Sequence, residues 1–117
     1  MTAQVTGRMR DRVLLYQDGA TGDSADPDNV RMAGTPEPCE IIDLKGGEVI
    51  RGRTFEANIA ALVTMTLNSR TAKLNARSML LGRSFPWFNV QLFVNAVGIK
   101  KINGIPRLIE LDCRRDI

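Results

Sequence analysis

Residues 38–68, which read PCEIIDLKGGEVIRGRTFEANIAALVTMTLN, contain three different local signals in close succession. The first is Cys39–Leu44, a short apolar run with two isoleucines that is typical of a strand. Gly46-Gly47 ends this run, because glycine accepts positive φ and a pair of glycines marks a turn. The stretch therefore begins with a strand and a turn.

A helix is predicted to follow from Glu48. Its apolar residues have the i, i+4, i+7 spacing of one helical face: Phe55, Ile59 and Leu62. Arg51 and Arg53 fall on other faces. The period then changes to two in Val63–Leu67, where apolar and hydroxyl residues alternate as in a strand with one buried face. A helix between two strands needs something to cover, so the rest of the chain is expected to supply a sheet.

Four further segments have strand patterns, at residues 8–16, 77–81, 85–97 and 107–114. In the last of these, Ile109, Leu111 and Cys113 are expected to point inward. Asn103-Gly104 predicts a hairpin, because a type I′ turn requires positive φ at both central residues. The sequence thus predicts a mainly β fold: a small six-stranded barrel or curled antiparallel sheet, with one α-helix inserted between the second and third strands.

The chain is expected to form a single domain over residues 1–117, since this length supports only one modest core. Its apolar runs are too short to span a bilayer, and its first residues have no apolar segment of signal-peptide length. We therefore expect a cytoplasmic protein with no membrane partner. Residues 1–7 are small and polar, and they are expected to form a flexible tail.

The residue types argue against an enzyme and against a cofactor or metal site. The chain has no histidine, and its two cysteines, Cys39 and Cys113, are not at ligand spacing. Without imidazole, most acid-base and nucleophilic constellations are excluded. A set of carboxylates at Asp43, Glu48 and Glu56 remains as a distant enzymatic alternative. The cysteines are expected to be buried, reduced thiols.

Arginine supplies 12 of the 16 basic residues, and the net charge is +3. Arg8, Arg10 and Arg12 have a spacing of two, which places all three on one side of a strand. They are either a solvated face or a row that contacts a neighbouring subunit or DNA, because guanidinium groups pair well with carboxylates and phosphates. Arg51 and Arg53 are assigned the same inter-subunit or DNA-facing role.

Residues 18–36 form the only long loop of the predicted fold, and a loop of this length is usually functional or disordered. It carries four aspartates and one arginine that are candidates for contact with a channel or a partner: Asp18, Asp23, Asp26, Asp28 and Arg31. Phe85, Trp87 and Phe88 form a second unusual group. These aromatic residues are interpreted as core, with a base-stacking platform as the alternative.

The order of these segments resembles the head-tail joining (head closure, stopper or neck) proteins of long-tailed bacteriophages. The resemblance covers residues 8–115. It rests on an N-terminal strand with arginine and aliphatic residues, a Gly/Asp loop and the strand 40–44, followed by Lys45-Gly46-Gly47-Glu48 at the start of a helix. It continues through an alternating strand ending in Asn68-Ser69-Arg70, an aromatic-bearing strand at 85–97 and a final strand at 108–114.

The resemblance implies a structural virion protein that forms a homo-oligomeric ring of six or twelve copies under the portal or its adaptor. Such a ring retains packaged double-stranded DNA in its channel and docks the tail through a tail terminator or tail tube protein. Its location would be the virion neck, after assembly in the host cytoplasm. Tail-completion and tail-terminator proteins are alternatives, because comparable barrels occur among them. A small oligonucleotide-binding barrel that uses the aromatic group and the N-terminal arginines is a further alternative.

Overall fold

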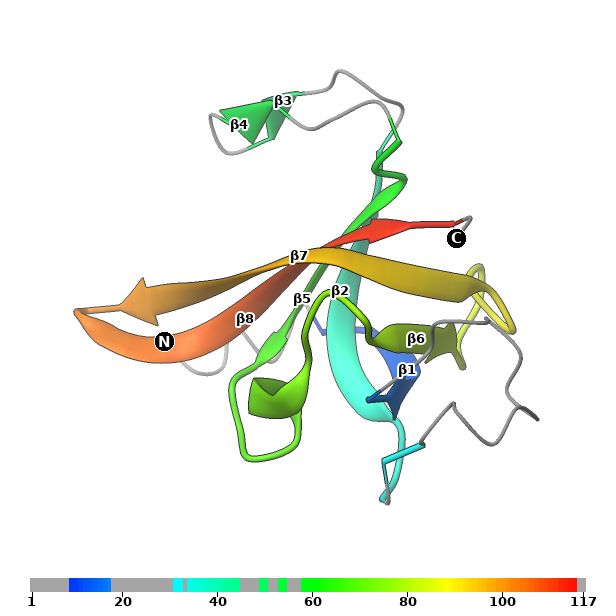
Figure 1. Cartoon of the computed structure of the whole chain (residues 1–117), viewed down its shortest axis with the longest axis horizontal. Helices are drawn as coiled ribbons and strands as arrows, with labels where there is room; N and C mark the ends of the chain where they lie inside the picture. Colours follow the sequence, from blue (N-terminus) through cyan, green and yellow to red (C-terminus); the bar gives the residue numbers. More distant parts are fainter. Residues whose placement is uncertain are drawn as a thin grey trace.

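The computed structural model describes residues 9–17, 31–32, 34–44, 49–50, 53–54 and 58–115. These residues form eight strands and one short 3-10 turn, η1 (Thr71–Lys73) (Figure 1). The strands are β1 (Asp11–Tyr16), β2 (Glu37–Asp43), β3 (Val49–Ile50), β4 (Arg53–Thr54), β5 (Ala61–Thr66), β6 (Met79–Gly82), β7 (Gln91–Ile102) and β8 (Ile105–Arg114).

Six of the strands close into an antiparallel barrel in the order β1-β2-β5-β8-β7-β6, with β6 pairing back onto β1. The predicted six-stranded barrel is therefore confirmed, and each barrel strand overlaps a segment with a predicted strand pattern. The two terminal strands do not pair with each other, because β8 lies between β5 and β7. Closure leaves strand edges only where neighbouring strands differ in length.

The core fills the barrel with the residues that period-two alternation places inside. Ile109, Leu111 and Cys113 of β8 are buried as predicted, and they face Ala61, Val63 and Met65 across the β5–β8 pair. On β1, Val13 and Leu15 join the same core cluster, and Met9 is buried just before the strand. This cluster is aliphatic apart from Trp87, the thioether of Met65 and the thiols of Cys39 and Cys113.

The predicted helix between the second and third barrel strands is wrong. Val49–Ile50 and Arg53–Thr54 instead form a small two-stranded sheet, β3–β4, which stands beyond the barrel end where β2 finishes and β5 begins (Figure 1). Three of these four residues are β-branched and favour extended backbone. Ile59 and Leu62 are buried against Leu44, as the predicted apolar face requires, but Leu62 belongs to β5. Phe55 lies outside the described residues.

The β7–β8 hairpin extends past the barrel. Residues 96–108, here called the arm, project on the left of Figure 1, away from the short strand β6. β6 pairs with β7 only at Gln91, Leu92 and Phe93, although β7 continues to Ile102. The predicted turn is confirmed, with positive φ at Asn103 (52°) and Gly104 (78°).

Candidate functional site

The N-terminal arginine row is described from Arg10 onward, and both Arg10 and Arg12 are exposed, whereas Arg8 lies outside the described residues. The Arg12 guanidinium folds back on its own strand, where Nη1 donates to the carbonyl oxygens of Met9 (2.9 Å) and Asp11 (3.0 Å). Arg12 is therefore held close to the barrel, while the side chain of Arg10 is free to point into solvent.

The start of β1 is joined to residues 83–90, here called the aromatic loop, which connects β6 to β7. The Arg83 amide donates to the Arg12 carbonyl (2.7 Å), and the Arg12 amide donates to Ser84 Oγ (2.9 Å). The Asp11 carboxylate accepts from Ser84 Oγ (3.4 Å) and from the Ile41 amide (3.1 Å). The structure thus brings together two candidate regions that are far apart in the sequence.

The aromatic loop divides its three aromatic side chains between the core and the surface. Trp87 is buried and packs in the core cluster, as predicted. Phe85 and Phe88 are 84% and 41% exposed, so their prediction as core residues is wrong. Their rings stack on each other with centroids 5.6 Å apart, and the guanidinium carbon of Arg83 lies 4.7 Å from the Phe88 centroid. The surface at this point is a small aromatic platform with a cation beside it.

Local backbone geometry explains the exposure of the two phenylalanines. The Trp87 amide donates to the Ser84 carbonyl (2.8 Å) and the Val90 amide donates to the Trp87 carbonyl (2.9 Å), so the segment consists of turns. Asn89 has a φ of 61°, which strand backbone does not adopt. The strand predicted over 85–97 therefore begins only at Gln91, the first residue of β7.

The predicted channel or partner loop is described only at its C-terminal end. Asp18, Asp23, Asp26 and Asp28 lie outside the described residues. Arg31 is exposed, and it forms an isolated bridge with Tyr16. The Met32 amide donates to the Leu15 carbonyl (2.8 Å), so this end of the loop runs along β1. Of the other predicted contact residues, Arg51 lies outside the described residues and Arg53 lies in β4 opposite Ile50.

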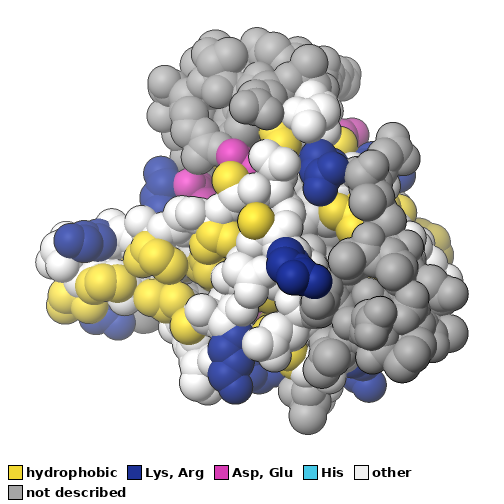
Figure 2. Space-filling view, in the orientation of Figure 1, with side chains coloured by type: hydrophobic (Ala, Val, Ile, Leu, Met, Phe, Trp, Pro, Cys, Tyr) yellow, Lys and Arg dark blue, Asp and Glu magenta, His cyan; other side chains and the backbone are white. Residues whose placement is uncertain are grey.

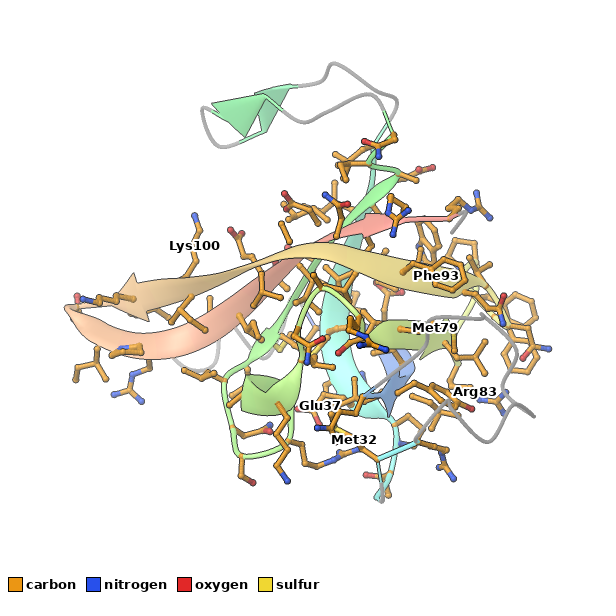
Figure 3. The ribbon with its side chains drawn as sticks, in the orientation of Figure 1. Met32, Glu37, Met79, Arg83, Phe93 and Lys100 are labelled. Carbon is orange, nitrogen blue, oxygen red and sulfur yellow. The ribbon has the colours of Figure 1, made fainter. Side chains whose placement is uncertain are left out.

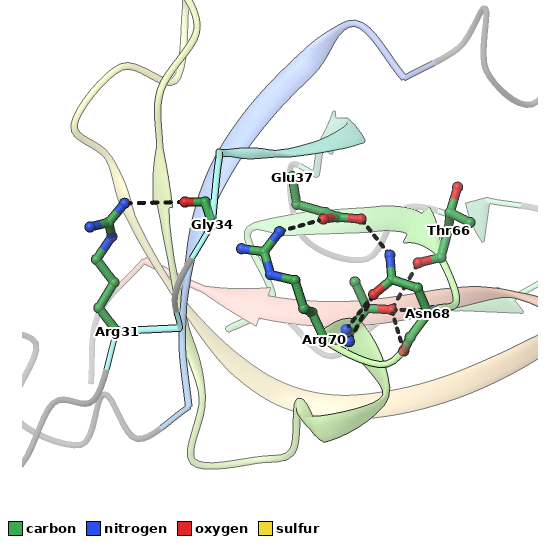
Figure 4. A network of polar contacts seen from close by, with 7 residues as sticks. Arg31, Gly34, Glu37, Thr66, Asn68 and Arg70 are labelled. Carbon is green, nitrogen blue, oxygen red and sulfur yellow. Dashed lines mark hydrogen bonds and ion pairs between the residues drawn. The ribbon is translucent and has the colours of Figure 1, made fainter.

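A polar network around the buried Glu37, which was not predicted from the sequence, fixes the segment after β5 (Figure 4). Glu37 accepts from Arg70 Nη1 (3.0 Å) and from Asn68 Nδ2 (2.8 Å). Asn68 Oδ1 in turn accepts from the backbone amides of Arg70 (2.9 Å) and Thr71 (3.0 Å). The Glu37 carboxylate thus joins β2 to the segment after β5 through one ion pair and one side-chain hydrogen bond. The Asn68-to-Thr71 spacing is a turn-capping signal that could have revealed part of this network.

Residues that could hold a metal do not gather in the described ranges. No group of three or more histidine, cysteine, aspartate or glutamate residues occurs there in positions to bind a metal ion. Asp43 is exposed at the end of β2, while Glu48 and Glu56 lie outside the described residues. No helix in the described part of the chain is long and apolar enough to cross a membrane.

Both cysteines are free and buried, as predicted. Burial in the apolar core raises the pKa of the Cys39 and Cys113 thiols far above the ordinary range. The nearby carboxylates of Asp11 and Asp112 raise the pKa of Cys39 and Cys113, respectively, in the same direction. Neither thiol is therefore a reactive thiolate near neutral pH.

The arm carries the second group of exposed apolar side chains. Val97, Ile99 and Ile105 are 39%, 50% and 52% exposed. Figure 2 shows apolar side chains gathered over the projecting end of the molecule, with basic side chains beside them. Lys100 stands out from this part of β7, on the opposite side of the view from Arg83 (Figure 3). The structure thus has two separate groups of exposed apolar side chains, on the aromatic loop and on the arm, and each is a candidate interaction surface.

Comparison of the chain with protein-family models, with curated proteins and with solved structures gave no match.

Proposed function

We propose that this protein is a structural component of a tailed-bacteriophage virion, a head-tail connector of the head closure or stopper type. In this role, six or twelve copies form a ring in the neck, under the portal or adaptor. The ring holds double-stranded DNA in its channel and docks the tail through a tail terminator or tail tube protein. The observation that carries the proposal is the small closed barrel with a projecting apolar arm.

The arm supports an assembly role because it places apolar side chains where the protein's own core cannot cover them. Val97, Ile99 and Ile105 lie on one hairpin with exposed Lys100 and Lys101 beside them. Isolated apolar residues are ordinary on a protein surface, but a group on a projecting element is typical of a contact with another chain. A rigid barrel with such an arm suits a subunit that is built into a larger particle.

The order of the strands also supports the proposal, since the barrel forms from the segments on which the resemblance rests. The inserted helix implied by the resemblance is replaced by the β3–β4 hairpin at 49–50 and 53–54. The helix therefore contributes nothing to the argument. The barrel, the strand order and the arm are what support a neck component.

Electron microscopy of the purified protein and of mutant virions tests this function. We expect rings of six or twelve subunits, and tailless particles that leak DNA when the gene is deleted. Alanine substitution of Arg8, Arg10 and Arg12 together should lower the yield of infectious particles at least about tenfold. It should leave the fold unchanged, because Arg10 and Arg12 are exposed and exposed guanidinium groups contribute little stability. Lys73→Ala, an exposed basic residue on η1, is the matched control.

An unchanged yield in the triple variant would remove the contact role of the arginine row. Normal, tailed and DNA-filled particles after gene deletion would refute the connector function. Purified heads and purified tails, used separately as bait, distinguish the connector from a tail-completion or tail-terminator protein. A connector should bind portal-bearing heads first, whereas a tail terminator should bind free tails.

The exposure of Phe85 favours one second candidate function, the binding of single-stranded nucleic acid. Stacking of a base on an aromatic ring contributes about 1–3 kcal/mol, and Arg83 lies beside the platform. If this function is correct, a labelled oligonucleotide should bind at about 50 mM salt and lose affinity steeply by about 200 mM. Phe85→Ala should weaken binding about 5- to 150-fold, as expected for the loss of one stacking contact. The absence of binding at the lower salt concentration would dismiss this candidate.

A further inference from the structure

The strand β7 has an edge that no described strand covers from Asn95 onward. The pairing between β6 and β7 ends at Phe93, and the last backbone contact on that side is the Val94 amide to the Ser78 carbonyl (3.0 Å). The other edge of β7 is paired with β8 as far as Ile102. Residues 96–102 therefore present a row of backbone donors and acceptors to any extended strand that approaches.

The side chains on this edge are apolar on one face. Val97 is opposite Leu111 and Ile99 is opposite Ile109 in the β7–β8 pair. Residues directly opposite in an antiparallel pair share a face, so Val97 and Ile99 continue the face that points into the barrel. Beyond the barrel no described strand or turn covers this face, and both side chains are partly exposed. A free, apolar strand edge of this kind promotes association between chains.

We propose that this edge pairs antiparallel with the same edge of a second copy of the chain, about a two-fold axis at Gly98. In this register, Val97 lies opposite Ile99 of the second copy. The two-fold axis repeats this pair, so the contact contains two apolar cross-strand pairs. Lys100 then lies opposite Ala96 of the second copy. A Cβ built on Gly98 has no atom within 4 Å, so space at the axis is open.

The sequence of the edge selects this register over its neighbours. In an antiparallel pair, only every second residue directs its N–H and C=O groups to a given edge of the strand. When this edge pairs with the same edge of a second copy, the two-fold axis must therefore pass through a residue and not between two residues. Moving the axis from Gly98 to Ile99 would put Val97 opposite Lys101 of the second copy. Moving it to Lys100 would put two lysines opposite each other, and like charges across a pair are destabilising. The Gly98 register avoids both costs.

Such a contact is isologous, and it joins copies in pairs without closing a ring. The inference therefore does not rest on the proposed neck function. The pairing describes the free protein, and in an assembled ring the apolar arm would contact a neighbouring chain instead. In the free protein the pairing removes the exposed edge that otherwise serves as a template for aggregation.

Analytical ultracentrifugation of the full chain over a range of concentrations tests the pairing. We expect a monomer–dimer equilibrium for the wild type. The double variant Val97→Lys/Ile99→Lys should raise the dimer dissociation constant at least about 100-fold, because it replaces both apolar cross-strand pairs by like-charge pairs. Ile105→Lys is the matched control, since Ile105 is equally exposed on the same arm but belongs to β8. It should leave the dissociation constant within about threefold of wild type.

Cysteine cross-linking tests the register itself. G98C should form an intermolecular disulfide on mild oxidation, because residues on the axis face each other across the pair at Cα distances of about 4.5–5.5 Å. K101C should not, since Lys101 would be opposite Asn95 of the second copy. The native cysteines do not compete, because both are buried. A wild-type protein that stays monomeric at high concentration, a dimer unaffected by the double lysine variant, or cross-linking of K101C without G98C would each overturn the proposal.

Discussion

Replacing Gly82 with alanine should lower the free energy of unfolding by about 3 kcal/mol or more. A Cβ at this position would lie 1.9 Å from the carbonyl oxygen and 2.7 Å from the carbonyl carbon of Trp87. These are backbone atoms, so no side-chain rotation relieves the overlap. The chain must instead move the aromatic loop relative to the end of β6.

The aromatic loop has little freedom to make that movement. The Asn89 amide donates to the Gly82 carbonyl (2.8 Å), and the Gly82 amide donates to the Val90 carbonyl (2.9 Å). Trp87 is part of the core cluster, so displacing its backbone would also draw the indole out of the barrel. Because domains of this size have total stabilities of about 5–15 kcal/mol, this loss is a substantial fraction of the total and should lower the melting temperature clearly.

Urea denaturation followed by circular dichroism measures this loss, and Gly98→Ala is the matched control. Gly98 has no atom within 4 Å of an added Cβ, and it lies in a strand. Its replacement should leave stability unchanged or raise it by up to about 1 kcal/mol, because alanine loses less backbone entropy on folding than glycine. Equal losses in the free energy of unfolding for Gly82→Ala and Gly98→Ala would contradict this explanation. The close approach of the Trp87 backbone would then not be the reason that position 82 requires glycine.

The strands were predictable because their signals are local. Inward alternation of Ile109, Leu111 and Cys113 requires only a period of two, and the Asn103-Gly104 turn requires only two adjacent residues that accept positive φ. The same alternation accounts for the buried residues of β1, such as Val13 and Leu15. Closure into a barrel then removes most of the edges that several short strands would otherwise expose.

The helix was mispredicted because its pattern consists of only three apolar residues, at i, i+4 and i+7. So short a pattern does not distinguish one helical face from a hairpin followed by a strand. Ile59 and Leu62 are both buried, as a helical face would require, but they pack against Leu44, which directly follows β2, and Leu62 belongs to β5. The β-branched residues Val49, Ile50 and Thr54 were the contrary local signal. The preference of these residues for extended backbone outweighs the helical pattern of the three apolar residues.

The interaction surfaces were only partly predictable, because they depend on relations between distant segments. Phe85 was recognised as unusual, but its exposure depends on how the aromatic loop docks on β1 through Arg12 and Ser84. The arm projects because β6 has 4 residues whereas β7 has 12. Such a mismatch in strand length follows from the register of the whole barrel, and no single segment encodes it.

Two isoleucines that face each other across the β7–β8 pair should differ sharply when each is replaced with alanine. Ile109 is 1% exposed and contributes to the core, whereas Ile99, directly opposite, is half exposed on the arm. Ile109→Ala should lower the free energy of unfolding by about 2–5 kcal/mol, because it leaves a cavity in a closed barrel. Ile99→Ala should cost about 0.5 kcal/mol or less in the monomer, since a surface change leaves no cavity.

Measuring both variants by urea denaturation at low and high protein concentration separates core packing from association. Ile109→Ala should lose a similar amount of stability at both concentrations, because the cavity lies within one chain. Ile99→Ala should match the wild type when the protein is dilute and fall below it when the protein is concentrated, because association with a second copy stabilises the wild type by mass action. Equal losses for the two variants in dilute protein would mean that the arm packs as tightly as the barrel. Its apolar residues would then need no partner.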